Sequence, residues 1–204
     1  MNQARKLGGD LRERLISRPY RVIEDPDTSS YKRAGVLIPL LEEGGEVKVL
    51  LTQRTRKVEH HKGQISFPGG TMERRDGSVQ ETALREAQEE IGLMREDVEI
   101  LGRIDEARTL TSNYIVHPFV GLVPWPYDFR LNPDEVELLI SVPLQVFHPR
   151  DLRYRRPSVE YEGVTYTTAA FEYEKHVIWG ATARIMENFM DILADNLPLP
   201  GATE

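Results

Sequence analysis

The apolar residues of this chain fall into short runs separated by turn residues, a pattern that predicts a series of β-strands. The first two runs, residues 34–41 and 47–54, flank a break with Gly44 and Gly45, as in a β-hairpin. Residues 132–136 are expected to form a turn or a short helix. The further expected strands cover residues 64–67, 98–104, 114–123, 158–161 and 164–171.

Three other segments predict helices. One covers residues 3–17 and the last covers residues 178–196. Between them Ser78 begins a helix, because Glu81 three residues later completes a capping box, and Gly92 is its natural C-terminal stop. Its buried stripe, expected beside an acidic face, is Ala83, Leu84, Ala87 and Ile91. An α/β fold (α+β, with a mixed sheet sandwiched between helices) is the simplest packing for these elements.

Length and composition describe an ordinary globular protein. With 204 residues, 40% of them hydrophobic, a single domain over residues 1–204 is expected. Its core would cover about 32–196 and a disordered tail would cover 197–204. No apolar run approaches the roughly 20 residues that span a bilayer, and residues 1–20 lack the apolar segment of a signal peptide. There is no cysteine and so no disulfide framework. We therefore expect a cytoplasmic protein with no membrane partner.

The net charge of −7 argues against a protein that mainly coats nucleic acid. A small phosphorylated substrate is compatible with it, because metal ions and local arginines reverse the sign within a pocket. The basic residues are in fact uneven, since a cluster precedes the glycine pair at 69–70: Arg54, Arg56, Lys57 and Lys62. A homodimer is one assembly that the sequence allows.

The strongest chemical signal is acidic. Glu86, Glu89 and Glu90 stand at i, i+3 and i+4, so a helix projects them within about 100° of one another. Such like charges destabilise an isolated helix, whereas a divalent cation such as Mg²⁺ would turn that cost into binding energy. The alternative is a solvated helix face made of good helix formers. The neighbours favour a site, because Gly69 can aim a carbonyl oxygen at an ion and Arg85 can orient a carboxylate.

At these residues the chain resembles the Nudix hydrolases. The matching positions are Gly70, Arg85, Glu86, Glu89, Glu90 and Gly92. The interval from Gly70 to Arg85 is one residue longer than the usual pattern, and the loop acid is Asp76 or Glu73. The longer loop and the lead-in HKGQISFPGG at 61–70 are similar to the coenzyme A pyrophosphatase branch. Departures from that branch are Thr55, Glu59 and Asn113, of which asparagine tolerates positive φ.

The resemblance implies a Nudix-type fold and an activity. The expected reaction splits the pyrophosphate bond of coenzyme A or its thioesters, giving 4′-phosphopantetheine and adenosine 3′,5′-bisphosphate, with Mg²⁺ or Mn²⁺. Glu86 and Glu90 would be the primary metal ligands, with Glu89 and the Gly69 carbonyl completing the set. Glu86 and Glu89 both remain candidates for the general base, and Arg85 would orient Glu86.

Contacts to the substrate are expected from the residues before the helix. Arg54, Arg56 and Lys57 are candidates for binding its phosphates, although each of them also suits the exposed end of a strand. The same binding set includes His61, which would contact phosphate or stabilise its loop, and Gly70. Glu135 would be a distal metal ligand or base, or part of a solvated turn.

Two other functions share this acidic helix. One is a Nudix hydrolase of another nucleoside diphosphate derivative, such as ADP-ribose. The other is a non-catalytic sensor with the same fold, which would be expected to lack one or more of the glutamates at 86, 89 and 90.

Overall fold

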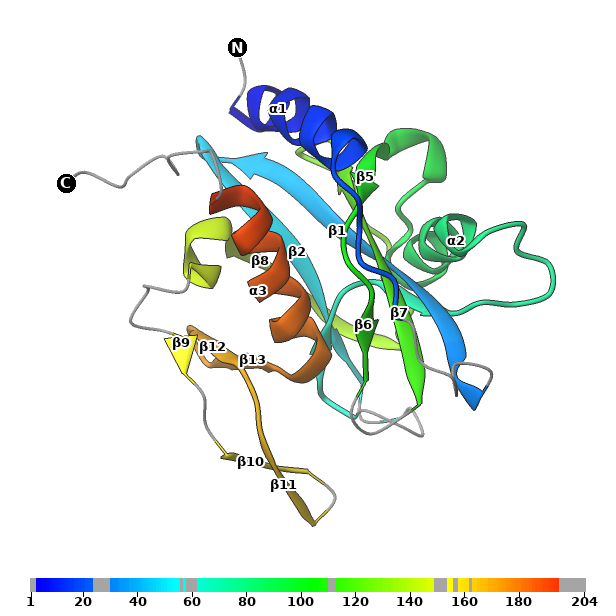
Figure 1. The fold of residues 1–204 in the computed structure, drawn as a ribbon, viewed down its shortest axis with the longest axis vertical. Coiled ribbons are helices and arrows are strands. Elements are labelled where there is room, and N and C mark those ends of the chain that lie inside the picture. The colour runs from blue at the N-terminus through cyan, green and yellow to red at the C-terminus, as the bar shows by residue number, and fades with distance from the viewer. Residues whose placement is uncertain are drawn as a thin grey trace.

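A computed structural model describes residues 3–23, 30–55, 57, 62–109, 113–148, 154–155, 158–161 and 163–194 (Figure 1). None of the helices within these ranges is both long and apolar enough to cross a membrane. In chain order the elements, with η for 3₁₀ helices, are α1 (Gln3–Ser17), β1 (Lys32–Glu43), β2 (Glu46–Arg54), β3 (Ile65–Ser66), β4 (Gly69–Thr71), α2 (Val79–Ile91), η2 (Arg95–Asp97), β5 (Glu99–Arg103), β6 (Ala107–Arg108), β7 (Tyr114–Leu122), β8 (Val136–Pro143), η3 (Leu144–Phe147), β9 (Tyr154–Arg155), β10 (Ser158–Tyr161), β11 (Val164–Thr167), β12 (Ala170–Tyr173), β13 (His176–Trp179) and α3 (Gly180–Ala194).

The main sheet has the order β3-β2-β1-β7-β5, with β4 also paired to β1, β6 to β7 and β8 to β2. β1 and β7 are parallel and the other pairs are antiparallel, so the sheet is mixed. Helices α1 and α3 pack on one face and α2 packs on the other (Figure 1). Two smaller sheets, β10-β11 and β13-β12-β9, complete the described structure. The predicted mixed sheet between helices is confirmed.

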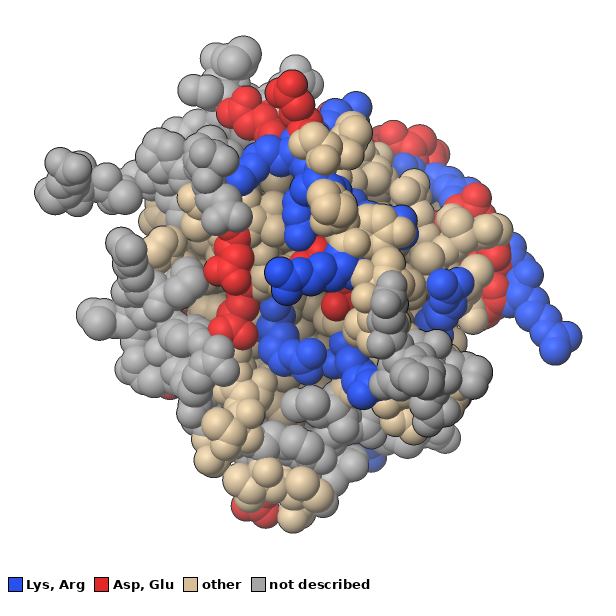
Figure 2. Space-filling view, viewed as in Figure 1, with Lys and Arg blue, Asp and Glu red and all other residues tan. Residues whose placement is uncertain are grey.

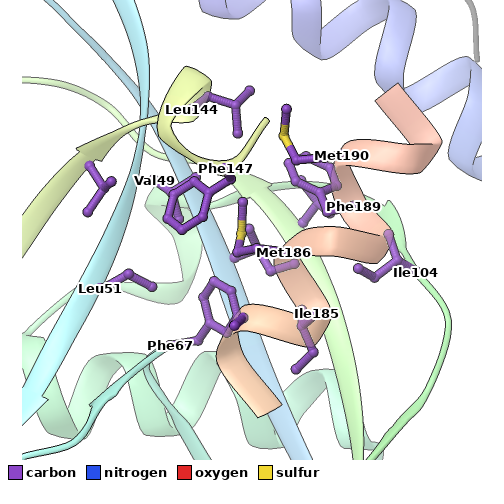
Figure 3. Packing of buried hydrophobic residues seen from close by; sticks show 14 of the residues in the cluster. Val49, Leu51, Phe67, Ile104, Leu144, Phe147, Ile185, Met186, Phe189 and Met190 are labelled. Atoms are coloured by element: carbon purple, nitrogen blue, oxygen red, sulfur yellow. The ribbon is translucent and has the colours of Figure 1, made fainter. Parts of the chain in front are cut away.

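The core consists of two clusters, one on each face of the sheet. Along β1, Ile38 and Leu40 belong to the cluster under α1 and α3, whereas Leu37 and Leu41 belong to the cluster under α2. This alternation follows from the two-residue period of a strand. Figure 3 shows part of the larger cluster, where β2, the segment before β4, η3 and α3 contribute Val49, Leu51, Phe67, Phe147, Met186 and Phe189.

The first hairpin has the predicted position. Its strands are longer than expected, because the register pairs Glu43 with Glu46 across only Gly44 and Gly45. Both glycines have positive φ, 62° and 82°, which is the requirement of the tightest hairpin turns. Asn113 has a φ of 50°, a left-handed conformation that asparagine tolerates.

The C-terminal prediction is wrong in two respects. The last helix begins at Gly180, whose φ of 68° is left-handed, and not at residue 178. Ile178 instead lies in β13, where it is buried and pairs with Phe171 of β12. The strand expected at 164–171 is two strands, β11 and the start of β12, in different sheets.

Strand β8 is missing from the sequence prediction. The turn expected at 132–136 is present over 133–135, and the chain then continues antiparallel to β2. The apolar residues of this strand alternate in the sequence except at Leu139. In the structure its pairing with β2 also shifts register between Gln53 and Arg54. The strand ends at Pro143.

The N-terminal segment is fixed to the face that α3 covers. Asp105 accepts hydrogen bonds from the Arg18 guanidinium (2.8 Å), the Arg21 backbone (2.9 Å) and the Asn188 amide (3.0 Å). These bonds hold the pKa of Asp105 below its usual range, although burial alone would raise it. Figure 2 shows lysine and arginine side chains gathered around the centre of this face, so the negative net charge is unevenly distributed.

Helix α2 begins and ends where its capping residues predict. The Ser78 hydroxyl accepts a hydrogen bond from Glu81 N at 3.1 Å, and the Glu81 carboxylate accepts one from Gly77 N at 3.0 Å. Gly92 ends the helix with a φ of 69°. The helix lies directly on β1, because a Cβ atom at Gly35 would be 2.2 Å from the Val79 carbonyl oxygen.

Replacing Gly35 by alanine should therefore destabilise the protein by about 2 kcal/mol or more, because the backbone of α2 would have to move away from the sheet. Urea unfolding measures the change. Gly9→Ala in α1 is the matched control, since nothing lies within 4 Å of its Cβ position, and it should stabilise by up to about 1 kcal/mol. A Gly35→Ala variant as stable as the wild type would contradict this description of the contact.

Candidate active site

The glycine pair and the acidic face of α2 meet in the structure. Gly69 N donates a hydrogen bond to Glu90 Oε2 at 3.2 Å. A Cβ atom at Gly70 would lie 2.5 Å from the Glu86 carboxyl carbon. β4 holds both glycines beside β1, where Gly69 pairs with Val36 and Gly70 with Gly35. Only glycine at position 70 leaves room for the Glu86 carboxylate.

Glu90 is buried, which the sequence did not predict. Its side chain is 2% exposed, whereas that of Glu89 is 44% exposed. The expected separation between an apolar stripe and an acidic face therefore fails at Glu90, which is buried together with Ala87 and Ile91. Burial is tolerated because Gly69 N and Arg54 provide hydrogen bonds to its two oxygens.

Burial makes the ionised forms of Glu86 and Glu90 unfavourable in this site. Burial raises the pKa of Glu90 to about 8, against the lowering effects of Arg54 and the Gly69 N–H, and the charges of Glu86 and Glu135 raise it further. Burial also raises the pKa of Glu86, although Arg85 lowers it. Glu135 again contributes to the rise. An added cation would stabilise the ionised form of each of these groups.

Arg85 is the centre of the arginine–carboxylate network. Its Nε and Nη2 donate to the two oxygens of Asp76 at 2.9 and 3.0 Å. Its Nη1 lies 2.9 Å from Glu86 Oε1 and 2.8 Å from Glu89 Oε2. Its hydrogen bonds to Asp76 are the main reason that the pKa of Arg85 is raised, and the same bonds hold the pKa of Asp76 far below its usual range.

The structure identifies the loop acid that the sequence left open. Asp76 is buried and also accepts hydrogen bonds from Glu73 N (2.9 Å) and the Thr82 hydroxyl (2.9 Å). The Glu73 side chain instead pairs with Arg75 at 2.8 Å on the surface. Asp76 is therefore the residue that orients Arg85.

The predicted substrate contacts are only partly visible. Arg54 ends β2, and its Nη1 lies 3.3 Å from Glu90 Oε1. Lys57 is largely exposed and lies 3.6 Å from Asp134. Arg56 and His61 lie outside the described residues.

Glu135 lies close to the acidic helix. Asn132 N donates to the Glu90 carbonyl at 2.9 Å, so the turn before β8 is tied to the end of α2. The Asn132 amide donates to Glu135 Oε1 at 3.2 Å, and the Glu135 carbonyl accepts from Thr55 N at 2.9 Å. The charge of Glu135 acts on both Glu86 and Glu90, so the turn lies close to the acidic helix.

The donor set fits a divalent cation. Among the described residues no three carboxylates or histidines already converge as a preformed ion site, and arginines pair with Glu86 and Glu90 instead. The residues nevertheless offer hard oxygen donors, a close approach at Gly70 and a buried carboxyl group, Glu90, whose ionised form a bound cation would stabilise. These are the properties that favour Mg²⁺ or Mn²⁺ over softer metals.

Comparison with known proteins identifies the family. A sequence model of the NUDIX domain matches residues 31–161. The uncharacterized Nudix hydrolase NudL of Escherichia coli strain SMS-3-5 is 35% identical over 166 residues, which cover 78% of this chain and 82% of the relative. The chain belongs to the Nudix hydrolase family. The NudL protein of Shigella boydii serotype 18 is similar to the same extent.

The fold agrees with that identification. A MutT/nudix family protein from Enterococcus faecalis superposes on this Nudix hydrolase with a TM-score of 0.55 and 16% identity, covering 92% of this chain and 70% of the other. The family resemblance drawn from residues 70 to 92 is thus confirmed. Nudix hydrolases act on pyrophosphate linkages. An acidic site whose carboxylates suit a divalent cation agrees with this activity.

Asp76→Asn should lower kcat by about 10- to 100-fold, because Arg85 would lose the charged, two-point contact that holds it against Glu86 and Glu89. Initial rates on any nucleoside diphosphate derivative that the wild type cleaves measure the effect. Glu73→Gln is the matched control and should remain within about twofold of the wild type. A larger loss for Glu73→Gln than for Asp76→Asn would show that the loop acid is assigned wrongly.

Proposed function

We propose that this Nudix hydrolase cleaves the pyrophosphate bond of coenzyme A or its thioesters. The products would be 4′-phosphopantetheine, or its acyl form, and adenosine 3′,5′-bisphosphate. The observation that carries the proposal is the lead-in at 61–70, which is similar to the coenzyme A branch and directly precedes the acidic site. Backbone hydrogen bonds from Arg54 N to the Gln64 carbonyl (3.0 Å) and from Leu37 N to the Pro68 carbonyl (2.9 Å) attach residues 64 and 68 of this lead-in to β2 and β1.

Glu86 and Glu90 would hold Mg²⁺ or Mn²⁺, with Glu89 and the Gly69 carbonyl as further donors. The bound ion supplies charge neutralisation on the phosphate oxygens and a more acidic water. Arg85 keeps Glu86 and Glu89 in fixed orientations through contacts of 2.9 and 2.8 Å. A carboxylate, Glu86 or Glu89, would accept the proton of the attacking water, and no covalent intermediate is required.

The basic residues around the site would bind the substrate phosphates. Arg54 ends β2, and Arg56 and Lys57 follow it closely in the sequence. Arginine suits this role because its planar fork matches phosphate oxygens. His61 and the backbone at Gly70 are the remaining proposed contacts. A small anionic substrate would be held by these cations and by the ion that the acidic helix would bind.

A non-catalytic sensor is a weaker alternative. The described site retains Glu86, Glu89 and Glu90, together with the Asp76–Arg85 pair that contacts the first two. A protein that only binds nucleotides has no need for this arrangement.

A substrate panel tests the assignment. With Mg²⁺, kcat/KM for coenzyme A should exceed that for ADP-ribose and for dinucleoside polyphosphates by at least about tenfold, since one polar recognition site commonly discriminates by that much. Glu90→Gln should lose about 10²-fold or more in kcat on every substrate, and circular dichroism should show a retained fold. Faster cleavage of ADP-ribose than of coenzyme A would sink the assignment while leaving the family unchanged. Binding without turnover on the whole panel would favour the sensor.

A further inference from the structure

The contact between Arg54 and Glu90 has an unusual geometry for a buried ion pair. Arg54 is the last residue of β2, at a register shift relative to β8, and such irregularities redirect side chains. Only its Nη1 reaches Glu90, at 3.3 Å. Its Nε is buried without a hydrogen-bond partner among the described residues.

The Arg85–Asp76 pair in the same site shows the contrast. There two parallel hydrogen bonds of 2.9 and 3.0 Å join the groups, and Thr82 and Glu73 N satisfy the carboxylate further. Such a two-point contact is suited to a permanent structural role. Arg54 makes one long contact instead, which is easily broken.

Electrostatics favour an exchange of partners at Glu90. Glu86, Glu90 and Glu135 are close enough for their charges to act on one another. Arg54 is the cation that pairs with Glu90 in the described residues. A guanidinium and a divalent cation compete for the same carboxylate oxygen, and either of them stabilises the ionised form of the buried carboxylate.

We propose that Arg54 is a placeholder cation, which holds the Glu90 carboxylate while no metal is bound and is released when the metal takes that carboxylate. The freed guanidinium then lies beside the metal, at the place where a substrate phosphate would arrive. Arg54 is thus a positioning residue for Glu90 in one state and a phosphate ligand in the other. This inference rests on the metal site proposed above and does not depend on which nucleotide derivative is cleaved.

The two roles predict opposite effects of an Arg54 substitution on metal binding and on substrate binding. Loss of the Arg54 charge removes a competitor of the metal, so metal binding to the free protein becomes tighter. The same loss removes a phosphate contact, so KM for the substrate rises. Loss of a residue that only maintains the fold would weaken both metal binding and substrate binding.

The test is Mn²⁺ binding to the substrate-free protein, measured by the electron paramagnetic resonance signal of free Mn²⁺. Arg54→Gln and Arg54→Met should bind Mn²⁺ about three- to tenfold more tightly than the wild type, as expected for loss of a nearby like charge. Their KM should rise by about tenfold or more. Arg54→Lys, which keeps the charge, should stay within about twofold of the wild type in Mn²⁺ affinity.

Arg12→Gln is the control for general loss of a positive charge, because Arg12 lies on α1, which packs on the opposite face of the sheet from α2, and it pairs with Glu99 of β5. It should leave Mn²⁺ affinity unchanged. Unchanged or weaker Mn²⁺ binding by both Arg54→Gln and Arg54→Met would overturn the placeholder role while leaving the metal site intact. A wild-type protein that binds no Mn²⁺, with no binding by the Arg54 variants either, would overturn the metal site and the placeholder role together.

Discussion

Helix α2 lies on β1 and β4 at a distance that only glycine permits. A Cβ atom at Gly35 would lie 2.2 Å from the Val79 carbonyl oxygen, and one at Gly70 would lie 2.5 Å from the Glu86 carboxyl carbon. This close approach brings Gly69 N within hydrogen-bonding distance of Glu90. The burial of Glu90, the position of Glu86 and the shape of the site all depend on it. A helix held farther out by side chains would leave the same glutamates on a solvated surface.

Close packing brings carboxylates together in the site, where two arginines with different contacts pair with them. Arg85 is fixed by the two-point contact to Asp76 and contacts Glu86 and Glu89 with its remaining nitrogen. Arg54 makes a single long contact to Glu90. The raised pKa of Glu90, about 8, shows that these cations do not fully compensate for burial. We infer that a divalent cation, together with its substrate, provides the remaining stabilisation of the ionised Glu90 carboxylate.

Local sequence signals predicted the parts of the fold that depend on local chemistry. Ser78 and Gly92 mark the ends of α2, and Gly44-Gly45 marks the first hairpin, because capping and turn geometry are determined by a few adjacent residues. The C-terminal region was predicted less well. Ile178 suits either a helix or a strand, and its pairing with Phe171 is a property of the folded chain. β8 was missed because Leu139 interrupts the alternation of its apolar residues.

The sequence predicted which residues belong to the candidate site, but it did not predict which contacts they make. Spacing from Gly70 could not choose between Asp76 and Glu73, because both lie in the loop and only burial distinguishes them. Arg54 was expected to contact phosphate because it belongs to the basic cluster before the glycine pair, yet in the structure it contacts Glu90. The link from Asn132 to Glu90 joins segments far apart in the chain. No local pattern contains it.

The central claim is that the buried acidic face of α2 exists to bind a divalent cation beside Gly69. Crystals soaked in Mn²⁺ and measured at a wavelength with strong anomalous scattering test it most directly. We predict an anomalous peak within ligand distance of the Glu86 and Glu90 carboxylates, at about 2.0 to 2.3 Å for such a hard cation. A map without a peak there, with those side chains still paired to Arg85 and Arg54, would contradict the account.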